Sequence, residues 1–379
     1  MAVNCNSFQS HGRQCGVALI SILLVLTVLA TLAIYAAEDQ NLAIRRSQNQ
    51  SLSEQGYQVN QSGEQWVLKV LEKDMVNDLS RSSEGAGVVD YRGEIWGNLG
   101  PPVEVGETGV TLLMIIEDLQ GRFNLNNLVE GKRRLPPESA QQVDPNQPGD
   151  NAGEEEQPSF WYQILQNMFV SLDINPELVD PLIDWIDGDE EPIGTTGAED
   201  FYYTGLEEPY RTANRSIASI AELSSIKDFN VEIIEKLSPW VTALPLDGGN
   251  LTTVNVNTAP ARVLAGFAAS QPVDLTLLSP LLEQRQGQPF VTIEEFSQQY
   301  NALVPSGLVP GYEKMLGVDS KFFAGHSCAD SGRVKFSMTS LMEKQSSGQN
   351  VKVLQRERFF GCPRLPVEQS DRPEEPQNS

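Results

Sequence analysis

Acidic side chains gather in one stretch of the chain, residues 182–203, which reads LIDWIDGDEEPIGTTGAEDFYY. So many carboxylates at close quarters repel one another unless they are solvated or bound to a cation. Calcium suits such a set because it takes roughly six to eight carboxylate and carbonyl oxygens in irregular geometry, and the turn at 192–197 can offer carbonyls. We therefore expect a calcium site, with a solvated acidic loop as the alternative. The expected ligands are Asp187, Asp189, Glu199 and Asp200, with Asp184 as a weaker candidate.

Other kinds of site find little support in the sequence. The acidic stretch is not an EF-hand, because Pro192 stands where that motif needs Gly and Ala198 where it needs a bidentate Glu. The chain has two histidines, His11 and His326, which argues against histidine-based triads and zinc sites. No P-loop or GxGxxG motif opens a helix. Paired carboxylates can serve a glycosidase, but no aromatic-rich sugar-binding pattern surrounds these.

The N-terminal region predicts a membrane segment that continues into a longer helix. Residues 17–37 are 21 positions without a charge, long enough to span roughly 30 Å of hydrocarbon. Arg13 before them should stay cytoplasmic, so the C-terminal bulk crosses the membrane. Because no Pro occurs from 38 to about 79, we predict one helix of about 60 residues whose second half packs on a globular domain. Its expected packed positions are Val67, Leu71, Met75 and Leu79, with Trp66 and Val70 beside them.

The junction at residues 13–20, RQCGVALI, resembles the cleavage site of type IV prepilin-like proteins. That resemblance implies that a prepilin peptidase cuts after Gly16 and N-methylates Val17, although the family usually has Phe or Met there. Most such subunits carry Glu at the fifth mature position, where this chain has Ser21. The family's Glu is thought to neutralise the terminal amine of an adjacent subunit, since an unpaired acid in lipid is costly. Its absence implies a subunit at the filament tip, and a generic single-pass anchor is the alternative.

Strand-like segments stand on both sides of a long stretch of different character. The first is an apolar run at 111–117, and two more, at 334–342 and 351–360, read as a hairpin around a polar turn. Two cysteines flank this hairpin, Cys328 and Cys362. We predict that they form a disulfide that closes a loop of about 34 residues, and two unpaired thiols are the alternative.

The stretch between the strands predicts helices. Residues 136–158 are rich in Pro, Gly and acids and offer little to bury, so we expect disorder there, as in 367–379. From 160 to about 316 the periodicity is helical, with a weak internal repeat. Ser219 and Thr292 each begin a capping box with a Glu three residues later, and Asn-containing caps with Pro in the first turn lie upstream at 175–176 and 257–260. These patterns predict two related small helical units inserted into an α+β domain.

The charge of the chain argues against nucleic acid as a partner. Lys and Arg total 27 against 51 Asp and Glu, a net charge of -24, which repels phosphate backbones. Residues 254–267 resemble a helix-hairpin-helix or SAM-like element found in DNA-binding proteins, but only Arg262 is basic there, so we assign them to helix packing. The segment GRFNLNNL at 121–128 reads as a turn whose Asn and Gly residues satisfy local backbone groups.

The combination of the N-terminal junction, the first strand, the acidic WIDxD and GAEDxYY pattern and the helical segment resembles the K-type minor pseudopilin of bacterial type II secretion. The resemblance implies the α+β class and a type IV pilin-like fold, in which a long N-terminal helix packs on a small antiparallel sheet, with a large inserted all-α domain of two SAM-like helical units. The expected division is a leader at 1–16, the membrane half of the helix at 17–37, the amphipathic helix and first part of the pilin-like domain at 38–128, a disordered acidic loop at 136–158, the helical insert at 159–318, the C-terminal strands at 319–366 and a disordered tail at 367–379.

The function implied by this resemblance is structural and not enzymatic. Such a subunit sits at the tip of the periplasmic pseudopilus and initiates or caps its assembly for export of folded proteins across the outer membrane. The implied partners are the I-type and J-type minor pseudopilins, the pseudopilus, the prepilin peptidase and the inner membrane, which the chain crosses once with its C-terminal bulk in the periplasm. A minor pilin of a type IV pilus is one alternative, and a membrane-anchored periplasmic hydrolase that uses the acidic cluster is another.

Overall fold

The computed structural model describes residues 15–83, 87–106, 109–130, 159–246, 249–345 and 350–362. Both segments expected to be disordered, 136–158 and 367–379, lie outside these residues. The chain divides into two compact units, Met1–Gln58 and Val59–Ser379.

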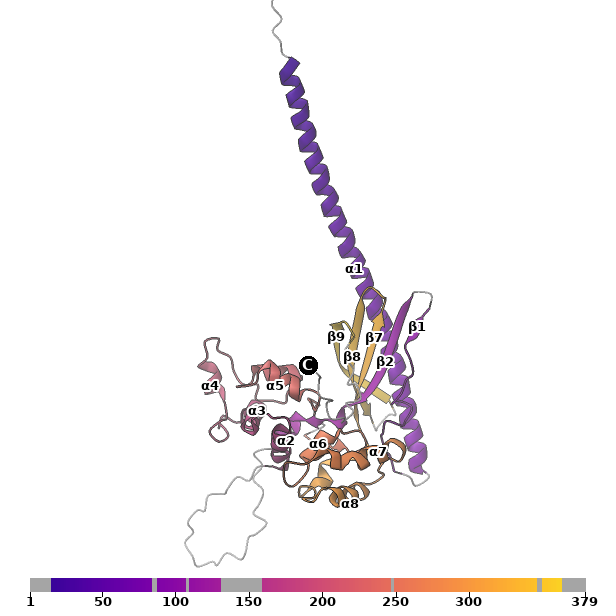
Figure 1. Cartoon of the computed structure of the whole chain (residues 1–379), viewed down its shortest axis with the longest axis vertical. Helices are drawn as coiled ribbons and strands as arrows, with labels where there is room; N and C mark the ends of the chain where they lie inside the picture. The colour runs from indigo at the N-terminus through magenta and orange to yellow at the C-terminus, as the bar shows by residue number, and fades with distance from the viewer. Residues whose placement is uncertain are drawn as a thin grey trace, which may run out of the picture. The chain divides into compact units, whose positions relative to one another are not determined.

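Helix α1, Cys15–Ser83, confirms the prediction of one long proline-free helix (Figure 1). In the first unit its side chains from residue 19 to residue 51 are exposed, and those from Leu19 to Tyr35 are mostly large and apolar. A helix that is apolar all round is stable in lipid or in a protein core. Among the described residues, one helix is long and apolar enough to cross a membrane, and it contains this segment. The first unit therefore supplies a candidate membrane anchor.

In the second unit, α1 buries one face that is only partly apolar. Its buried positions recur at spacings of four and three residues, which places them on one face of the helix. They are Asn60, Glu64, Val67, Leu71, Asp74 and Asp78. The predicted burial of Val67 and Leu71 is confirmed, whereas Leu79 and Trp66 are exposed. The prediction for Leu79 was wrong because the neighbouring Asp78 is the residue that faces the domain.

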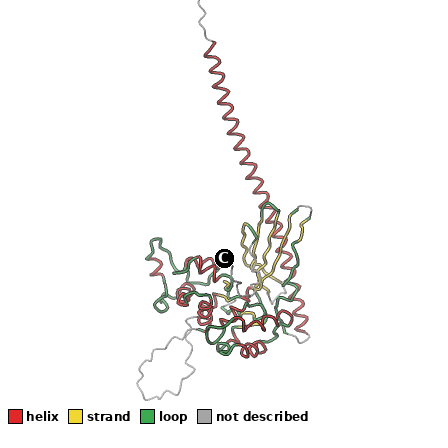
Figure 2. Tube along the Cα trace, viewed as in Figure 1, coloured by secondary structure: helices red, strands yellow, loops and turns green. Residues whose placement is uncertain are grey.

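A five-stranded antiparallel sheet packs against this face, and its strands are drawn in yellow in Figure 2. In sheet order they are β1 Val103–Val105, β2 Val110–Asp118, β7 Phe322–Asp330, β8 Lys335–Gln345 and β9 Asn350–Phe360. The predictions of β2, β8 and β9 are confirmed. Strand β7 was missed because small and polar residues dominate its sequence, FFAGHSCAD, and these have weak strand propensity.

The small residues of β7 follow from its place at the centre of the sheet. A Cβ atom built on Gly325 would lie 2.8 Å from the Met342 side chain and 3.0 Å from that of Val67 in α1. Phe323, two residues earlier on the same strand, packs in the same core cluster as Val67. Because side chains alternate along a strand, the even-numbered residues of β7 lie on the opposite face of the sheet, away from α1.

Cys328 in β7 and Cys362 just after β9 form a disulfide with a Cα–Cα distance of 5.5 Å, which confirms the predicted pairing. Cys328 belongs to the even-numbered row of β7. The bridge therefore holds the end of the described chain on the face of the sheet opposite α1.

The residues between β2 and β7 form the helical insert (Figure 1). Its elements are 3-10 helices η1 Leu119–Gly121 and η2 Leu125–Glu130, then α2 Phe160–Ser171, η3 Pro176–Leu178, α3 Val179–Ile186, α4 Asp200–Thr204, η4 Ile220–Ser225, α5 Val231–Leu237, α6 Ala261–Gly266, η5 Leu275–Leu278, α7 Ser279–Gly287, α8 Ile293–Leu303 and η6 Tyr312–Lys314. Two parallel ladders of two residues per strand accompany the helices: β3 Phe123–Asn124 with β4 Val241–Thr242, and β5 Val254–Asn255 with β6 Leu316–Gly317.

Apolar side chains from both predicted helical units share one core cluster, which contains Trp161, Leu182, Leu264 and Phe296. Phe123, from the segment that follows β2, belongs to the same cluster. The insert therefore has a continuous core that begins directly after the first long strand.

The helix-start signals are borne out at three of the four predicted places. The side chain of Thr292 caps α8, that of Ser219 caps the 3-10 helix η4, and that of Asn175 caps η3. The prediction that Asn257 caps a helix was wrong. Its amide exchanges hydrogen bonds with the backbone of Phe290, and Pro260 itself is the residue preceding α6.

Candidate metal centre

The acidic stretch starts on α3, a helix in which every residue is buried. Its apolar side chains, such as Leu182, enter the core, and its carboxylates hold the loop that follows. Asp184 accepts hydrogen bonds from the backbone N–H of Ile193 at 3.0 Å and of Ala198 at 2.6 Å. Backbone donors to a buried carboxylate compensate its lost hydration. Asp184 therefore folds the loop back onto its own helix.

Asp180, one turn earlier on α3, fixes the same loop from a second point. It accepts hydrogen bonds from the hydroxyl of Thr196 and, at 2.6 Å, from that of Tyr162 on α2. Burial and this bond to Asp180 raise the pKa of the Tyr162 hydroxyl. The Lys227 ammonium donates to the carbonyl of Thr196 at 3.0 Å. Helix α3 and Lys227 therefore hold the turn of the loop directly, and Tyr162 of α2 holds Asp180 in place.

Two glycines let the loop lie this close to α3. A Cβ on Gly197 would lie 2.3 Å from an Asp184 carboxylate oxygen, so a larger residue cannot occupy that position without a shift. Gly194 has φ of +57°, the left-handed region that favours glycine. The glycine at each end of the GTTG sequence at 194–197 is therefore explained by steric limits.

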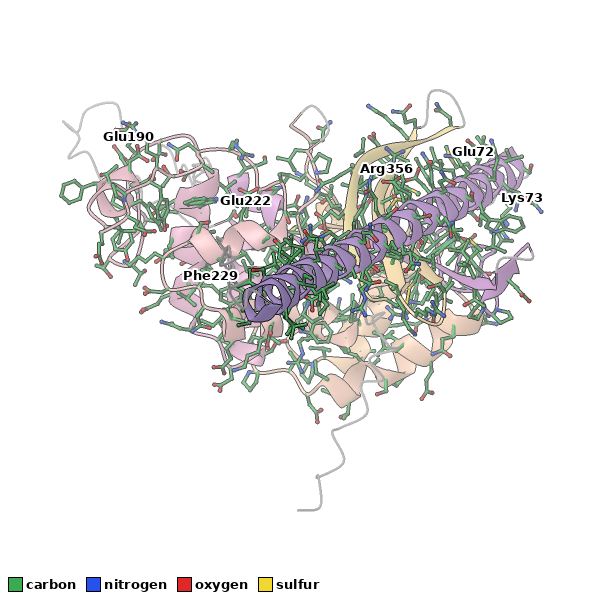
Figure 3. The ribbon with its side chains drawn as sticks, turned by 90° about the horizontal axis from the view of Figure 1, so that it is seen from above. Glu72, Lys73, Glu190, Glu222, Phe229 and Arg356 are labelled. Atoms are coloured by element: carbon green, nitrogen blue, oxygen red, sulfur yellow. A yellow bond between two sulfur atoms is a disulfide. The ribbon has the colours of Figure 1, made fainter. Side chains whose placement is uncertain are left out.

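Three of the five predicted ligands lie together at the ends of this loop. Carboxylate oxygens of Asp187, Asp189 and Glu199, one from each residue, lie within 4.8 Å of one another. Calcium binds oxygens at about 2.3–2.6 Å, so two ligands of one ion can be up to roughly 5 Å apart. Asp187 and Glu199 are buried and Asp189 is exposed. The neighbouring Glu190 lies at the periphery of this unit in Figure 3, away from the labelled Arg356 of the sheet.

The other two predicted ligands, Asp184 and Asp200, are not part of this group. Asp184 faces the loop amides described above. Asp200, the first residue of α4, accepts hydrogen bonds from the Thr212 backbone at 2.9 Å and its hydroxyl at 2.8 Å, and these bonds lower the pKa of Asp200. Arg211 adds an ion pair at 3.2 Å. Both carboxylates thus bind backbone amides, and three of the five predicted ligands lie together.

A second group of three carboxylates was missed by the sequence analysis. Asp74 and Asp78 of α1 and Asp90 of the following segment are all buried, with oxygens within 4.8 Å of one another. The Lys344 ammonium of β8 lies 2.9, 3.9 and 2.5 Å from them, respectively. The signal in the sequence was Lys344, a lysine that lies on the same face of β8 as the buried Met342.

Next to this group, Asp118 joins the sheet to the insert. One of its oxygens accepts hydrogen bonds from Asn255 at 3.0 Å, Thr258 at 2.5 Å and Ser320 at 2.7 Å. The Ser320 amide also donates to Asp90 at 2.7 Å. Burial raises the pKa of Asp118 to about 6. The segments that enter and leave the insert are therefore held by one buried polar network.

The asparagines of the GRFNLNNL segment bind distant parts of the insert in addition to the predicted local contact, in which the Asn126 amide donates to the Asn124 side chain at 3.2 Å. Asn124 and Asn126 each donate to the carbonyl of Leu244, at 3.2 and 2.8 Å, and Asn127 exchanges hydrogen bonds with the Thr252 backbone. All three are buried. These side-chain hydrogen bonds take the place of strand pairing, because the strands of the insert are only two residues long.

The residues assigned to maturation lie in α1. Gly16 and Val17 fall within its first turn, and Ser21 is exposed in the apolar segment. Cleavage and methylation stay predictions.

Comparison with known proteins agrees with this architecture. A family model for the type II secretion system protein K matches residues 121–246, and a second with the same description matches 254–308. The type II secretion system protein K of Pseudomonas aeruginosa is 34% identical over 291 residues, which are 76% of this chain and 78% of that protein. The chain belongs to the type II secretion system protein K family.

Other comparisons extend this similarity along the chain. The protein K of Aeromonas hydrophila is 28% identical over 357 residues, covering 92% of this chain and 98% of that protein. A solved structure, the GspK-GspI-GspJ complex from enterotoxigenic Escherichia coli, contains a chain that matches 83% of this one with a TM-score of 0.58. At 20% identity that match supports the fold alone. The fold expected of protein K, a long N-terminal helix, an antiparallel sheet and a helical insert, is thereby confirmed.

Proposed function

We propose that this chain is a minor pseudopilin at the tip of the periplasmic pseudopilus, where it initiates or caps assembly of the filament that exports folded proteins across the outer membrane. The observation that carries the proposal is family membership together with one helix that is apolar in its first unit and packs on a sheet in its second. A filament subunit needs both a membrane anchor and a folded head.

Two features favour the tip over the shaft. Ser21 replaces the membrane acid that would pair with a subunit above it. The insert between β2 and β7 is larger than the sheet domain, and a shaft of tightly packed subunits has little room to repeat it. A type IV pilus minor pilin would also carry such an anchor, but the two protein K family matches cover the insert.

The proposed partners are the I-type and J-type minor pseudopilins. A similar chain was solved in a complex with GspI and GspJ, which supports the same association here. The prepilin peptidase would cut between Gly16 and Val17 and leave the chain as a single-pass protein of the inner membrane, with its C-terminal bulk in the periplasm. The net charge of -24 disfavours nucleic acid.

Calcium is the proposed cofactor. The donors Asp187, Asp189 and Glu199 are oxygen ligands at a spacing that one ion can bridge, which supports a fit. The bound ion would supply positive charge and fix the ends of the loop. Its role would be structural, and we propose no catalytic step. The alternative of a periplasmic hydrolase predicts an activity that Asp187→Asn abolishes without loss of folding.

Immunogold labelling of isolated filaments tests the proposed function. The expected result is label at one end of each filament, and regular label along the shaft would refute the tip assignment. Ser21→Glu serves as a matched variant that restores the acid, and we expect it to be tolerated or mildly harmful.

Peptide mass mapping of the membrane form should find Val17 as a methylated first residue, and an intact Met1 would contradict processing.

A further inference from the structure

Buried carboxylates meet where the end of α1 packs on the rest of the second unit. Asp74, Asp78 and Asp90 form the group described above. Glu94 lies near enough to feel the charges of all three, and its side chain is 3% exposed. These four residues are called the acid cluster below. Like charges at this spacing repel one another, so the acid cluster needs cations, hydrogen-bond donors or protons to compensate them.

The cations that face the acid cluster are fewer than its acids. Lys344 of β8 is one of them, at the distances given above. Arg81 of α1 is the other, and it is half exposed and pairs with Glu94 at 3.0 Å. Asp319 adds a further acid at an exposed position near Asp90. Among the residues that the structure describes, the cations therefore leave part of the negative charge uncompensated.

Hydrogen-bond donors are also too few. An ionised carboxylate only accepts hydrogen bonds, and the Lys344 ammonium donates to Asp74 and to Asp90. The same ammonium lies 3.9 Å from Asp78, too far for a hydrogen bond. The Oδ1 atom of Asp78 is buried and has no hydrogen-bond partner within the described part of the chain. Because a buried acceptor without a donor costs free energy, this oxygen is the point of the acid cluster that lacks a ligand.

A proton supplies what is missing. It removes one negative charge, and it gives the carboxyl group an O–H that can donate to a neighbouring carboxylate. Burial, together with the charges of Asp74 and Asp90, raises the pKa of Asp78 to about 6, and burial raises that of Glu94 to about 7. A metal ion fits less well, because the Lys344 ammonium already binds both Asp74 and Asp90.

The acid cluster lies where three parts of the unit meet. Two of its acids come from α1, and Lys344 comes from β8. Asp90, in the segment that follows α1, also accepts a hydrogen bond from the Ser320 amide at 2.7 Å. The Ser320 hydroxyl in turn donates to Asp118, at the start of the insert. The contacts of the acid cluster therefore connect the helix, the sheet and the insert.

We propose that protons on Asp78 and Glu94 fasten the end of α1 to residues 87–97, and that the loss of these protons loosens the contact. Folding raises the pKa of both groups, so their contribution is complete below an unfolded pKa of about 4 and is lost as the pH rises through 6 to 7. The pH of the surroundings then sets how firmly α1 holds the rest of the unit. The proposal goes beyond the tip function and does not depend on it.

Hydrogen exchange of the full chain in detergent and EDTA tests the proposal. Protection factors, corrected for the pH dependence of the chemical exchange rate, are compared at pH 5.5 and pH 7.5, at labelling times short enough that local openings dominate. Protection in 71–83 and 88–97 should be about tenfold higher at pH 5.5, the effect of one pKa unit. Protection in α2 should not change. Equal protection at both pH values, or an equal change in α2, would overturn the proposal.

Variants that mimic the protonated acids test which groups hold the protons. The double variant Asp78→Asn/Glu94→Gln removes both charges and supplies N–H donors, so it should keep at pH 7.5 the protection seen at pH 5.5. Glu72, labelled in Figure 3, pairs with Lys69 on the same helix. Glu72→Gln is therefore the matched control and should leave the pH response unchanged. If the double variant responds to pH as Glu72→Gln does, the acid cluster is not the sensor and the proposal fails.

Divalent cations distinguish a proton from a metal ion as the ligand. Calcium or magnesium in place of EDTA at pH 7.5 should leave exchange in 71–83 and 88–97 unchanged. Protection of these residues that either ion restores at pH 7.5 would make the acid cluster a metal site and would overturn the assignment of protons.

Discussion

Two groups of three carboxylates lie in the second unit of this chain and differ in what balances their charge. Asp74, Asp78 and Asp90 surround the Lys344 ammonium, and all four side chains are buried. Asp187, Asp189 and Glu199 lie at the ends of a loop, and Asp189 is exposed. The first group is paired with a cation of the chain itself, whereas we propose that the second is paired with calcium.

A cluster of acids does not by itself indicate a metal site. The spacing of the oxygens is the same in both groups, within 4.8 Å. What differs is the surrounding structure: α1 and β8 bring a lysine into one group, and in the other Asp180 and Asp184 use their oxygens to shape the loop. The prediction of metal ligands from sequence therefore needs the position of the cations as well as that of the acids.

Removal of the internal cation should have the largest effect. Lys344→Met leaves three buried carboxylates without their ammonium, and breaking a buried pair from one side costs about 3–5 kcal/mol of unfolding free energy. Denaturant unfolding of the purified protein measures it. Lys321→Met is the matched control, because Lys321 pairs with Glu343 at 2.9 Å at a partly exposed site and should contribute under about 1 kcal/mol. Equal losses in the two variants would refute the difference drawn between buried and exposed charge pairs.

Calcium should have the next largest effect, and only at the loop. A ligand that binds the folded state alone stabilises it by about 2.7 kcal/mol when present at roughly 100 times its Kd. Calcium should therefore raise the melting temperature and EDTA should lower it, and Asp187→Asn should remove both responses. The same titration on Lys344→Met checks the comparison, since its calcium response should persist. A melting curve that ignores calcium would remove the proposed cofactor.

The sequence predicted the elements whose pattern is carried by apolar side chains. The long helix, β2, β8 and β9 follow from uninterrupted or alternating apolar runs, and the disulfide from the places of its two cysteines. Strand β7 was missed because close packing against α1 selects small residues such as Gly325, which give no strand signal. The buried polar face of α1 was missed for a related reason: Asp74 is stabilised by Lys344, 270 residues away, and no local pattern reveals that contact.

Three of the five residues that the sequence named as ligands lie together in the structure, and the calcium site itself stays a prediction. The acidic loop drew attention through its density of carboxylates, and three of the five named residues lie together. Which carboxylates face each other depends on how the loop folds back on α3, and this depends on backbone amides such as that of Ala198. Sequence spacing carries no information on that choice.

The junction around Lys344 should give the protein an unusual dependence of stability on pH. Burial, with the nearby charge of Asp74, raises the pKa of Glu94 to about 7, and burial raises that of Asp78 to about 6. A group whose pKa is raised by folding contributes its full stabilisation at pH values below its unfolded pKa of about 4. This contribution is lost as the pH rises through 6 to 7. Unfolding free energy in EDTA should therefore increase from pH 8 to pH 5. Glu94→Gln should flatten the change, and Glu232→Gln, at an exposed site, should not.

Glu117 should limit how far the unfolding free energy increases at acidic pH. Burial alone would raise its pKa, but the charge of Arg122 and the hydrogen bond with His326 hold it at about 2. A group whose pKa is lowered by folding contributes its full stabilisation at pH values above its unfolded pKa, about 4.3 for Glu. This contribution is lost as the pH falls toward 2. The unfolding free energy should therefore pass through a maximum between about pH 4 and 6. A monotonic rise with pH from 4 to 8 would contradict the raised pKa values of Glu94 and Asp78, and an unfolding free energy that does not fall below pH 4 would contradict the lowered pKa of Glu117.

The smallest effect should come from Asp200. It tests whether Asp200 is a calcium ligand, as the sequence suggested, or lies outside the ligand set. If Asp200 were a ligand, as its place in the sequence suggested, Asp200→Asn would weaken calcium binding as strongly as Asp189→Asn does. The structure gives it another role, since its carboxylate accepts two hydrogen bonds from Thr212 and pairs with Arg211 at the surface. An asparagine side chain keeps one acceptor oxygen for the Thr212 amide, and the ion pair with Arg211 lies at the surface, so the loss of stability should be small. Calorimetric titration with calcium should then find the Kd of Asp200→Asn within about twofold of the parent and that of Asp189→Asn at least tenfold weaker, because one of three clustered carboxylates is gone. A Kd that rises equally in both variants would return Asp200 to the ligand set.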